Sequence, residues 1–306
     1  MKSGKLFIAI LALAIAFVRC SAPKTVVVET KDPSIQKLQD ANNAFSAGDY
    51  QKALTNYEEI VELKKLEKKR PDSTIYQNAG ISAWELKQTD KAIQYLEIAK
   101  RYPIATDKTY SILAKIFLEK DNLSKEITNL EAYTTKYPQG SEIQAMRKQL
   151  FNAYLKSENW DSSYKLWTSI DPKDQNDAKM LNSYFKVCEK LNYKNQLDGV
   201  AQKLLKADAN NIDALEHFAE KYYWLAENSY IKEMKAYNEH KTQEQYQKLL
   251  AAFKVLNENY KISRDYFLRL YQISPKSRYA TFLGNIFTRF ENKEKADYYY
   301  NLAKKK

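Results

Sequence analysis

Apolar residues recur at steps of three and four along most of the chain, which is the spacing of a helix with one buried face. One segment has apolar or small residues at positions 76, 79, 80 and 83, and a second run occupies positions 92, 95, 96 and 99. The polar stretch Lys87–Asp90 separates the two runs. Two helices of about 13 residues joined by a tight turn fit this pattern. We therefore predict antiparallel helix pairs.

Prolines repeat at a nearly constant distance along the same part of the chain. Pro71, Pro103, Pro138 and Pro172 are separated by 32, 35 and 34 residues. Internal periods of roughly 20 to 50 residues are typical of stacked repeats. The segments between these prolines are therefore expected to be successive helix pairs.

Small residues occupy the positions at which the two helices of a pair must cross closely. They are Gly80, Ala114 and Gly284 in first helices and Ala53, Ala92 and Ala296 in second helices. A side chain larger than a methyl group would push the backbones apart there. At one turn, Gly48 suits a left-handed helix end and Asp49 can cap the helix that follows.

These residues resemble the tetratricopeptide repeat (TPR) family. The best copies surround Gly48, Gly80 and Gly284, and weaker copies have Glu126, Ser163 or Gln196 in the position of the second-helix alanine. Ala92 and Glu126 are 34 residues apart, which is the family's period. The resemblance covers about residues 35–304. It implies an all-α, right-handed superhelical TPR-like solenoid of antiparallel helix pairs, with a concave groove that binds proteins or peptides.

The segment from Ile212 to Ser274 departs from the repeat because it has no clean turn at the expected place. Its apolar pattern predicts one lengthened hairpin, made of two long helices on either side of Asn238–Thr242. At 1.5 Å per residue, each helix is expected to be roughly 40 Å long. This hairpin is either a stiffening element of the array or an arm that docks a partner.

The first residues form a separate unit. A basic start, Met1–Lys5, precedes an unbroken apolar run of 13 residues, Leu6–Val18. A helix that spans a bilayer needs about 20 residues, so this run is typical of a secretion signal. We therefore assign residues 1–19 to a signal peptide, residues 20–33 to a linker and residues 34–306 to the helical repeat domain.

Cys20 follows the signal directly and resembles the lipid-attachment cysteine of bacterial lipoproteins. Phe17 and Arg19 stand where the usual lipobox has Leu and a small residue, so an ordinary cleaved signal and an uncleaved anchor stay open as alternatives. The resemblance implies lipidation of Cys20 and anchoring at the cell envelope. Ser21 favours the outer membrane in the enterobacterial pattern, and a soluble periplasmic protein is the second choice.

The composition gives little material for catalysis. There are only 6 Gly, 7 Pro, 2 Cys and 2 His, which disfavours Gly-rich nucleotide folds, disulfide frameworks and histidine metal sites. His217, His240 and Cys188 are expected to be packed or solvated structural residues. No P-loop, zinc-protease or nucleophile-elbow motif occurs. We therefore predict no enzyme activity and no cofactor.

The arrangement of the charges along the chain argues against nucleic acid as a partner, although the net charge is positive. The formal net charge is +11, but the lysines alternate with glutamates, as in Glu62–Arg70. Alternating charges do not produce the concentrated positive field that phosphate binding needs. We predict no nucleic-acid partner.

The TPR resemblance assigns a set of groove positions, when its pattern is carried over residue by residue. They are Gln77, Ile81, Trp84, Lys115, Lys148, Asn152, Phe185, Glu220 and Tyr223. The three aromatic residues among them are binding hot spots or are buried by neighbouring repeats. The predicted function is a non-enzymatic scaffold of the bacterial envelope that binds proteins through the groove or the long hairpin. The alternatives are a component of outer-membrane protein assembly or secretion, and a glycan-binding surface lipoprotein.

Overall fold

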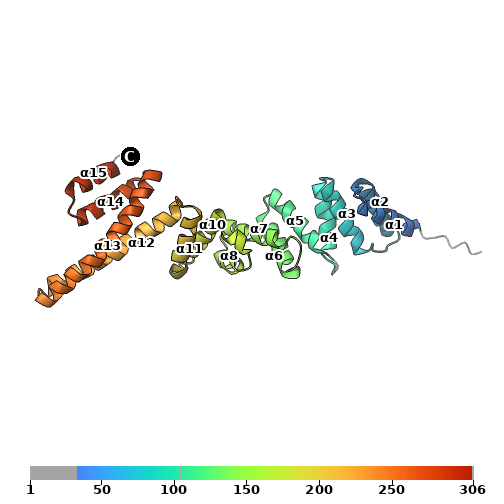
Figure 1. Cartoon of the computed structure of the whole chain (residues 1–306). Coiled ribbons are helices and arrows are strands. Elements are labelled where there is room, and N and C mark those ends of the chain that lie inside the picture. The colour runs from blue at the N-terminus through green and yellow to red at the C-terminus, as the bar shows by residue number, and fades with distance from the viewer. Residues whose placement is uncertain (1–32, 104, 305–306) are drawn as a thin grey trace, which may run out of the picture. The chain divides into compact units, whose positions relative to one another are not determined.

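The computed structural model describes residues 33–103 and 105–304, and in this part of the chain the structure contains helices and no strand (Figure 1). The predicted all-α fold of sequential helix pairs is confirmed. The signal peptide, Cys20 and all but the last residue of the linker lie outside the described residues. None of the described helices is both long enough and apolar enough to cross a membrane.

The chain divides into two compact units, and the first ends at Pro71. Its helices are α1 (Pro33–Ser46) and α2 (Tyr50–Leu66). They pack through Ala41 and Tyr57, both fully buried. The Tyr57 hydroxyl donates to Asn42 Oδ1 at 2.7 Å, so this buried phenol keeps a hydrogen-bond partner.

The second unit, from Asp72, carries the other helices. They are α3 (Ser73–Glu85), α4 (Thr89–Ala99), α5 (Asp107–Glu119), α6 (Leu123–Lys136), α7 (Ile143–Lys156), α8 (Trp160–Trp167), α9 (Pro172–Gln175), α10 (Ala178–Lys190), α11 (Lys194–Ala207), α12 (Ile212–Glu239), α13 (Gln243–Ile273), α14 (Ser277–Arg289) and α15 (Lys293–Lys304). Helices that follow each other pack as pairs: α3 with α4, α5 with α6, α7 with α8, α10 with α11, α12 with α13, and α14 with α15.

A left-handed residue ends the first helix of most pairs. The residues with this conformation at the turns between paired helices are Gly48 (φ 77°), Lys87 (61°), Asp121 (52°), Glu158 (55°), Asn192 (55°) and Glu291 (56°). The next amide closes the turn, as where Gln88 N donates to Ala83 O at 2.8 Å. Only one of these six residues is glycine, so glycine alone does not reveal the turns.

The small residues at the helix crossings lie where the sequence predicts. A Cβ on Gly80 would be 2.6 Å from Leu96 Cγ, and a Cβ on Gly284 would be 2.6 Å from the Tyr300 ring. Ala92 is fully buried at the equivalent place on α4. The crossings therefore leave no room for a larger side chain unless the facing side chain moves.

The position of the second-helix alanine needs one correction. In α4 it is Ala92, four residues after the N-cap Gln88. In α11 the N-cap is Tyr193, so the equivalent residue is Leu197, and the predicted Gln196 is exposed. The prediction was wrong by one residue because a helix start cannot be fixed to one position from periodicity alone.

Glu126 takes the alanine position in α6 and is buried. Its carboxylate accepts a hydrogen bond from Gln149 Nε2 at 2.9 Å, so the next helix pair compensates its burial.

Pro172 departs from the expected boundary pattern. It is the first residue of the four-residue helix α9, at the position where proline's missing N–H costs nothing. The preceding helix α8 is only 8 residues long, shorter than the length expected for a repeat helix. The short helix α8 is therefore followed by an extra helix, α9, that the periodic pattern does not show.

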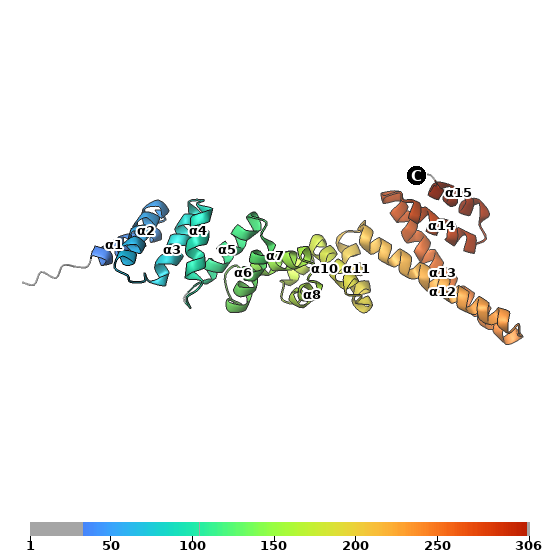
Figure 2. The ribbon, with the colours of Figure 1, turned by 180° about the vertical axis from the view of Figure 1, so that it is seen from behind.

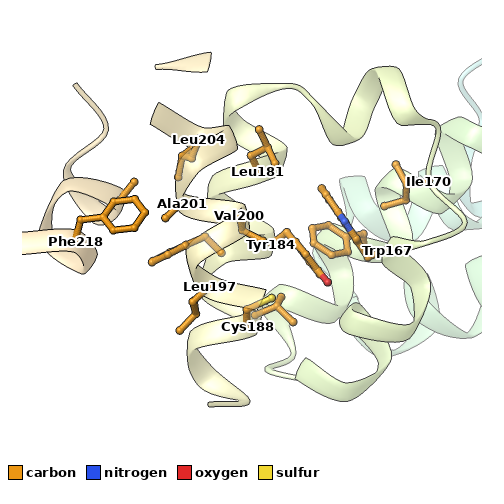
Figure 3. Close-up of a cluster of buried hydrophobic side chains, with 14 residues drawn as sticks. Trp167, Ile170, Leu181, Tyr184, Cys188, Leu197, Val200, Ala201, Leu204 and Phe218 are labelled. Atoms are coloured by element: carbon orange, nitrogen blue, oxygen red, sulfur yellow. The ribbon is translucent and has the colours of Figure 1, made fainter. Parts of the chain in front are cut away.

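A cluster of buried side chains joins α8, α10 and α11 (Figure 3). The rings of Trp167 and Tyr184 stack with centroids 4.2 Å apart and planes 4° apart. Cys188 is fully buried beside them, and burial raises the pKa of its thiol. The expectation that this cysteine is a packed residue is confirmed.

The lengthened hairpin is confirmed (Figure 2). Helices α12 and α13 contain 28 and 31 residues, pack side by side and are joined at His240–Thr242. At 1.5 Å per residue they are roughly 42 and 46 Å long. We call residues 230–253 the distal hairpin. Its rings pair across the two helices, Tyr230 with Phe253 and Tyr237 with Tyr246.

Candidate functional site

A cleft of about 690 Å³ lies between α10, α11, α12 and the start of α14. All four helices belong to the second unit. Most of its lining side chains are charged. The acidic ones are Glu189, Asp198, Asp213, Glu216 and Glu220, and the basic ones are Lys186, Lys194, Lys221 and Arg278. We call this hollow the α10–α14 cleft.

Aromatic side chains line part of the cleft. Phe185 belongs to the buried face of α10 and is only 3% exposed. The His217 ring meets it edge to face, with centroids 5.7 Å apart. His217 Nε2 lies 2.9 Å from Asp198 Oδ1. His217 is therefore half-buried and held by a carboxylate, which fits the structural role expected from the sequence.

Asp198 is the most strongly engaged carboxylate of the cleft. Burial by itself raises its pKa, but hydrogen bonds from Lys221 and His217 outweigh burial, so the pKa is lowered. Lys186 lies 3.7 Å from Asp213 on the same side of the cleft. These two carboxylates and two lysines neutralise one another within the protein, so they are poorly suited to bind a charged ligand.

A row of carboxylates on α12 meets basic side chains of α14 and of the residue before it. Glu216 pairs with Lys276 at 3.3 Å, and Glu220 accepts a charged hydrogen bond from Arg278. The pKa of Glu220 is nevertheless raised, first by burial and then by the nearby carboxylates Glu216 and Glu189, against the opposing effect of Arg278. Burial is therefore the main reason why ionisation of Glu220 is disfavoured.

Two charged side chains of the cleft have no ion-pair partner among the described residues. Glu189 lies on the last turn of α10, and Lys194 begins α11. Both are exposed. A ligand can therefore bind these two charges without first breaking an ion pair inside the protein.

Trp224 stands at the cleft with 48% of its surface exposed. The Tyr223 ring lies 5.0 Å from it at 86°, and Phe282 of α14 lies 6.4 Å away at 89°. These contacts hold the indole in place and leave nearly half of it open. A fixed, half-exposed tryptophan is the typical anchor of a protein interface.

Two predicted groove residues, Phe185 and Glu220, line this cleft. Tyr223 does not line it and is only 5% exposed, because it faces the α13–α14 side and its hydroxyl accepts from Asn285 Nδ2 at 3.2 Å. The aromatic residue that reaches the cleft is its neighbour Trp224. The helical step from Glu216 through Glu220 to position 224 could have identified it.

Lys148 and Asn152 line a second hollow of about 550 Å³, between α7, α9 and α10. Lys148 pairs with Asp174 of α9 at 3.1 Å. Asn152 is exposed. The short helix α9 thus supplies an acidic side chain that neutralises one of the two predicted groove residues.

The other predicted groove residues are engaged in contacts within the protein. Gln77 Oε1 accepts from Thr106 N at 2.8 Å, and Lys115 pairs with Glu142 of the next repeat. Ile81 is buried. Trp84 is half-buried, with the Lys87 ammonium 5.2 Å from its ring centroid.

Sequence reasoning missed several residues of the cleft. Lys194, Asp198 and Arg278 line it, and no pattern around them indicates this. Arg278 reaches Glu220 across 58 residues of sequence, so only the fold brings them together.

No protein-family model matches the chain. No curated protein matches it either. Solved structures with a similar arrangement of helices include YrrB, a TPR protein with an unusual peptide-binding site. That chain is 15% identical, the match covers 62% of this chain and 93% of that one, and the TM-score is 0.45.

Two further structures are similar at the same level. A putative protein-binding protein from Bacteroides ovatus is 17% identical, with coverage of 72% and 100% and a TM-score of 0.49. The C-terminal part of a TPR repeat-containing protein from Cytophaga hutchinsonii is 15% identical, with coverage of 87% and 93% and a TM-score of 0.43. Two of these three structures, YrrB and the Cytophaga hutchinsonii protein, are described as TPR proteins.

Proposed function

We propose that the protein is a non-enzymatic scaffold and that a segment of a partner protein binds in the α10–α14 cleft. The observation that carries this proposal is the combination of Trp224, fixed but half-exposed, with Glu189 and Lys194, two charges without an ion-pair partner within residues 33–103 and 105–304. Interface hot spots are enriched in such aromatic anchors. Affinity comes from complementarity to preformed helix faces, without chemistry.

The size of the cleft favours a short segment over a folded domain. Pockets that enclose a ligand commonly measure about 300 to 1,000 Å³, and this one has about 690 Å³. Its walls belong to helices that are anchored in buried clusters, as Phe185 and Leu215 show. The cleft is therefore available to a partner without prior rearrangement.

Site-specific photo-crosslinking in cells tests this proposal. A photoreactive residue at Asn195, which is exposed and lines the cleft, is expected to capture a partner protein. The same residue at Lys203, exposed on the same helix but outside the cleft lining, is the matched control. Equal capture at both positions, or capture at neither, would contradict a binding role for the cleft.

We also propose that the protein is anchored in the bacterial envelope through a lipid on Cys20. The support is the sequence: a basic start, a short apolar run and a cysteine directly after it. Fatty-acid labelling of cells should mark the wild type and not Cys20→Ser. Unlabelled wild-type protein in the soluble periplasmic fraction would instead favour a cleaved signal.

The identity of the captured partner decides between the finer functions. Subunits of outer-membrane protein assembly or secretion would place the scaffold in an envelope machine. Binding of purified protein to peptidoglycan or glycan resin, without a partner, would favour the carbohydrate alternative.

A further inference from the structure

The contacts between α12 and α14 show how this surface holds a basic side chain. Arg289 donates to both carboxylate oxygens of Glu227, with Nε 3.1 Å from Oε2. The guanidinium carbon of Arg289 lies 3.9 Å from the centroid of the Tyr230 ring. A carboxylate and an aromatic face thus act together on one cation, through a charged hydrogen bond and a cation–π contact.

The same combination recurs two turns earlier on α12. Glu220 accepts from Arg278, whose guanidinium lies 5.8 Å from the Phe282 centroid. Here the arginine stands at the rim of the α10–α14 cleft. In both cases a basic residue of α14 supplies the cation.

The cleft carries the same two kinds of group, without a cation between them among the described residues. Glu189 supplies a carboxylate without an ion-pair partner, and Trp224 supplies an open ring. Tryptophan is the ring that attracts cations most strongly. We propose that the cleft recognises a lysine or arginine side chain of the partner segment, with its charge at Glu189 and its stem on Trp224. This inference rests on the proposed function of the cleft.

The carboxylate that is left unpaired supports a cation over an anion. Four of the five carboxylates already have a basic partner, namely Asp198, Asp213, Glu216 and Glu220, which leaves Glu189. Glu189 also lies close enough to Glu220 to disfavour its ionisation, so a cation at Glu189 relieves that repulsion. An anion at the same place would add to that repulsion.

A metal ion fits this site less well than an organic cation. Within residues 33–103 and 105–304, no group of three or more His, Cys, Asp and Glu side chains is arranged to hold a metal. A guanidinium or ammonium on a flexible stem needs no such convergence, and its methylene groups gain contact with the indole.

Lys194 is the feature that could favour an acidic segment instead. Its side chain is exposed at the start of α11, as that of Glu189 is at the end of α10, so an ion pair at either residue alone would gain little. The open ring of Trp224 attracts cations and not anions, and this favours the basic segment. The experiment below includes an acidic peptide so that this outcome is visible.

The test uses the full chain labelled with ¹⁵N-tryptophan, whose four indole N–H signals report on each tryptophan separately. Trp224→Phe identifies the signal of the cleft. The probes are three capped peptides that differ at one residue: acetyl-Gly-Leu-Arg-Leu-Gly-amide, its citrulline analogue, which keeps the shape and loses the charge, and its glutamate analogue.

The arginine peptide is expected to shift the Trp224 signal and to bind about tenfold more tightly than the citrulline peptide, the combined effect of an exposed ion pair and a cation–π contact. Glu189→Gln should lower this preference to about threefold. Glu119→Gln, the same change at an exposed residue of α5, is the matched control and should keep it. Thermal melting of both variants verifies their folding.

Equal binding of the arginine and citrulline peptides, or preference for the glutamate peptide, would overturn the inference. Failure here is distinguishable from failure of the proposed function. A partner crosslinked at Asn195 by a segment without a basic residue would leave the cleft as a binding site and remove only its specificity.

Discussion

The early repeats and the α10–α14 region differ in which side chains of the groove face are left for a partner. In the early repeats, Gln77 bonds to the next helix pair and Lys115 pairs with Glu142. In the later region the predicted Phe185, Glu220 and Tyr223 are also buried or paired. Glu189 and Trp224, however, remain available in a cleft. A groove position therefore does not create a binding site by itself. What matters is whether the adjacent repeat has already used the side chain.

The largest loss of stability is expected at the contact between α14 and α12. Arg289→Ala leaves Glu227, whose side chain is 12% exposed, without its cation, and should lower the free energy of unfolding by about 3 kcal/mol at pH 7. Lys115→Gln removes a more exposed ion pair of the early repeats and should cost about 0.5 kcal/mol. Urea unfolding of both variants compares the two regions. Similar losses would contradict the difference drawn between them.

The Arg289 effect should depend on pH. Burial raises the pKa of Glu227, but hydrogen bonds from Arg289 and Tyr260 outweigh it, so the folded-state pKa is lowered. A lowered carboxylate pKa stabilises the fold above the unfolded-state value of about 4.3, and this stabilisation is lost as the pH falls through the folded-state pKa. The gap between wild type and Arg289→Ala should therefore shrink below about pH 4. A constant gap from pH 7 to pH 3 would exclude this linkage.

The helix crossings should behave alike in both regions. Gly80→Ala and Gly284→Ala each place a methyl group about 2.6 Å from a side chain of the paired helix. Each should cost about 2 kcal/mol through overpacking. Thermal unfolding monitored by circular dichroism measures both. A neutral result at one site would show that its partner, Leu96 or Tyr300, moves aside freely.

Glycine at the left-handed turn residues is expected to raise the free energy of unfolding by a smaller amount. Glu158→Gly removes the steric cost of a positive φ and should stabilise the fold by about 0.5 to 1 kcal/mol. Asn192→Gly, next to the cleft, should gain less because asparagine tolerates this conformation. Gly48→Ala is the reverse control. Its Cβ would meet nothing within 4 Å, so any loss comes from the backbone.

The smallest effect on stability is expected at the cleft itself. Trp224→Ala removes a half-exposed ring and should change the free energy of unfolding by less than about 1 kcal/mol. The same variant should lose the crosslink from Asn195. Phe185→Ala is unsuitable for this purpose because that ring is 3% exposed and its loss would leave a cavity. Retained crosslinking in folded Trp224→Ala would remove the anchor role.

The helix pairs could be predicted because their determinants are local. Small residues such as Gly80 and Ala92 and the spacing of apolar positions mark each crossing, and the long runs after Ile212 mark the hairpin. The turn at Lys87–Asp90 could be predicted, but the left-handed conformation of Lys87 and Glu158 could not, since these side chains do not indicate a positive φ. Helix α9 was missed because four residues are too few for a periodic pattern.

The candidate site was only partly predictable. Phe185 and Glu220 follow from the repeat pattern, whereas Tyr223 was chosen in place of Trp224 because a step of three and a step of four are both helical. Lys194 and Arg278 come from other helices and reach the cleft only because α11 and α14 lie beside α12. Tertiary contacts of this kind leave no trace in a single sequence.

Helix α12 is shared by two surfaces. Glu216, Glu220 and Trp224 line the cleft, and the same helix continues into the distal hairpin, where Ile231 is 54% exposed. Its sequence from Ile212 to Glu239 contains neither proline nor glycine, so it has no built-in joint. The wall of the cleft and the tip of the distal hairpin are therefore parts of one continuous helix, without a residue between them that favours a bend.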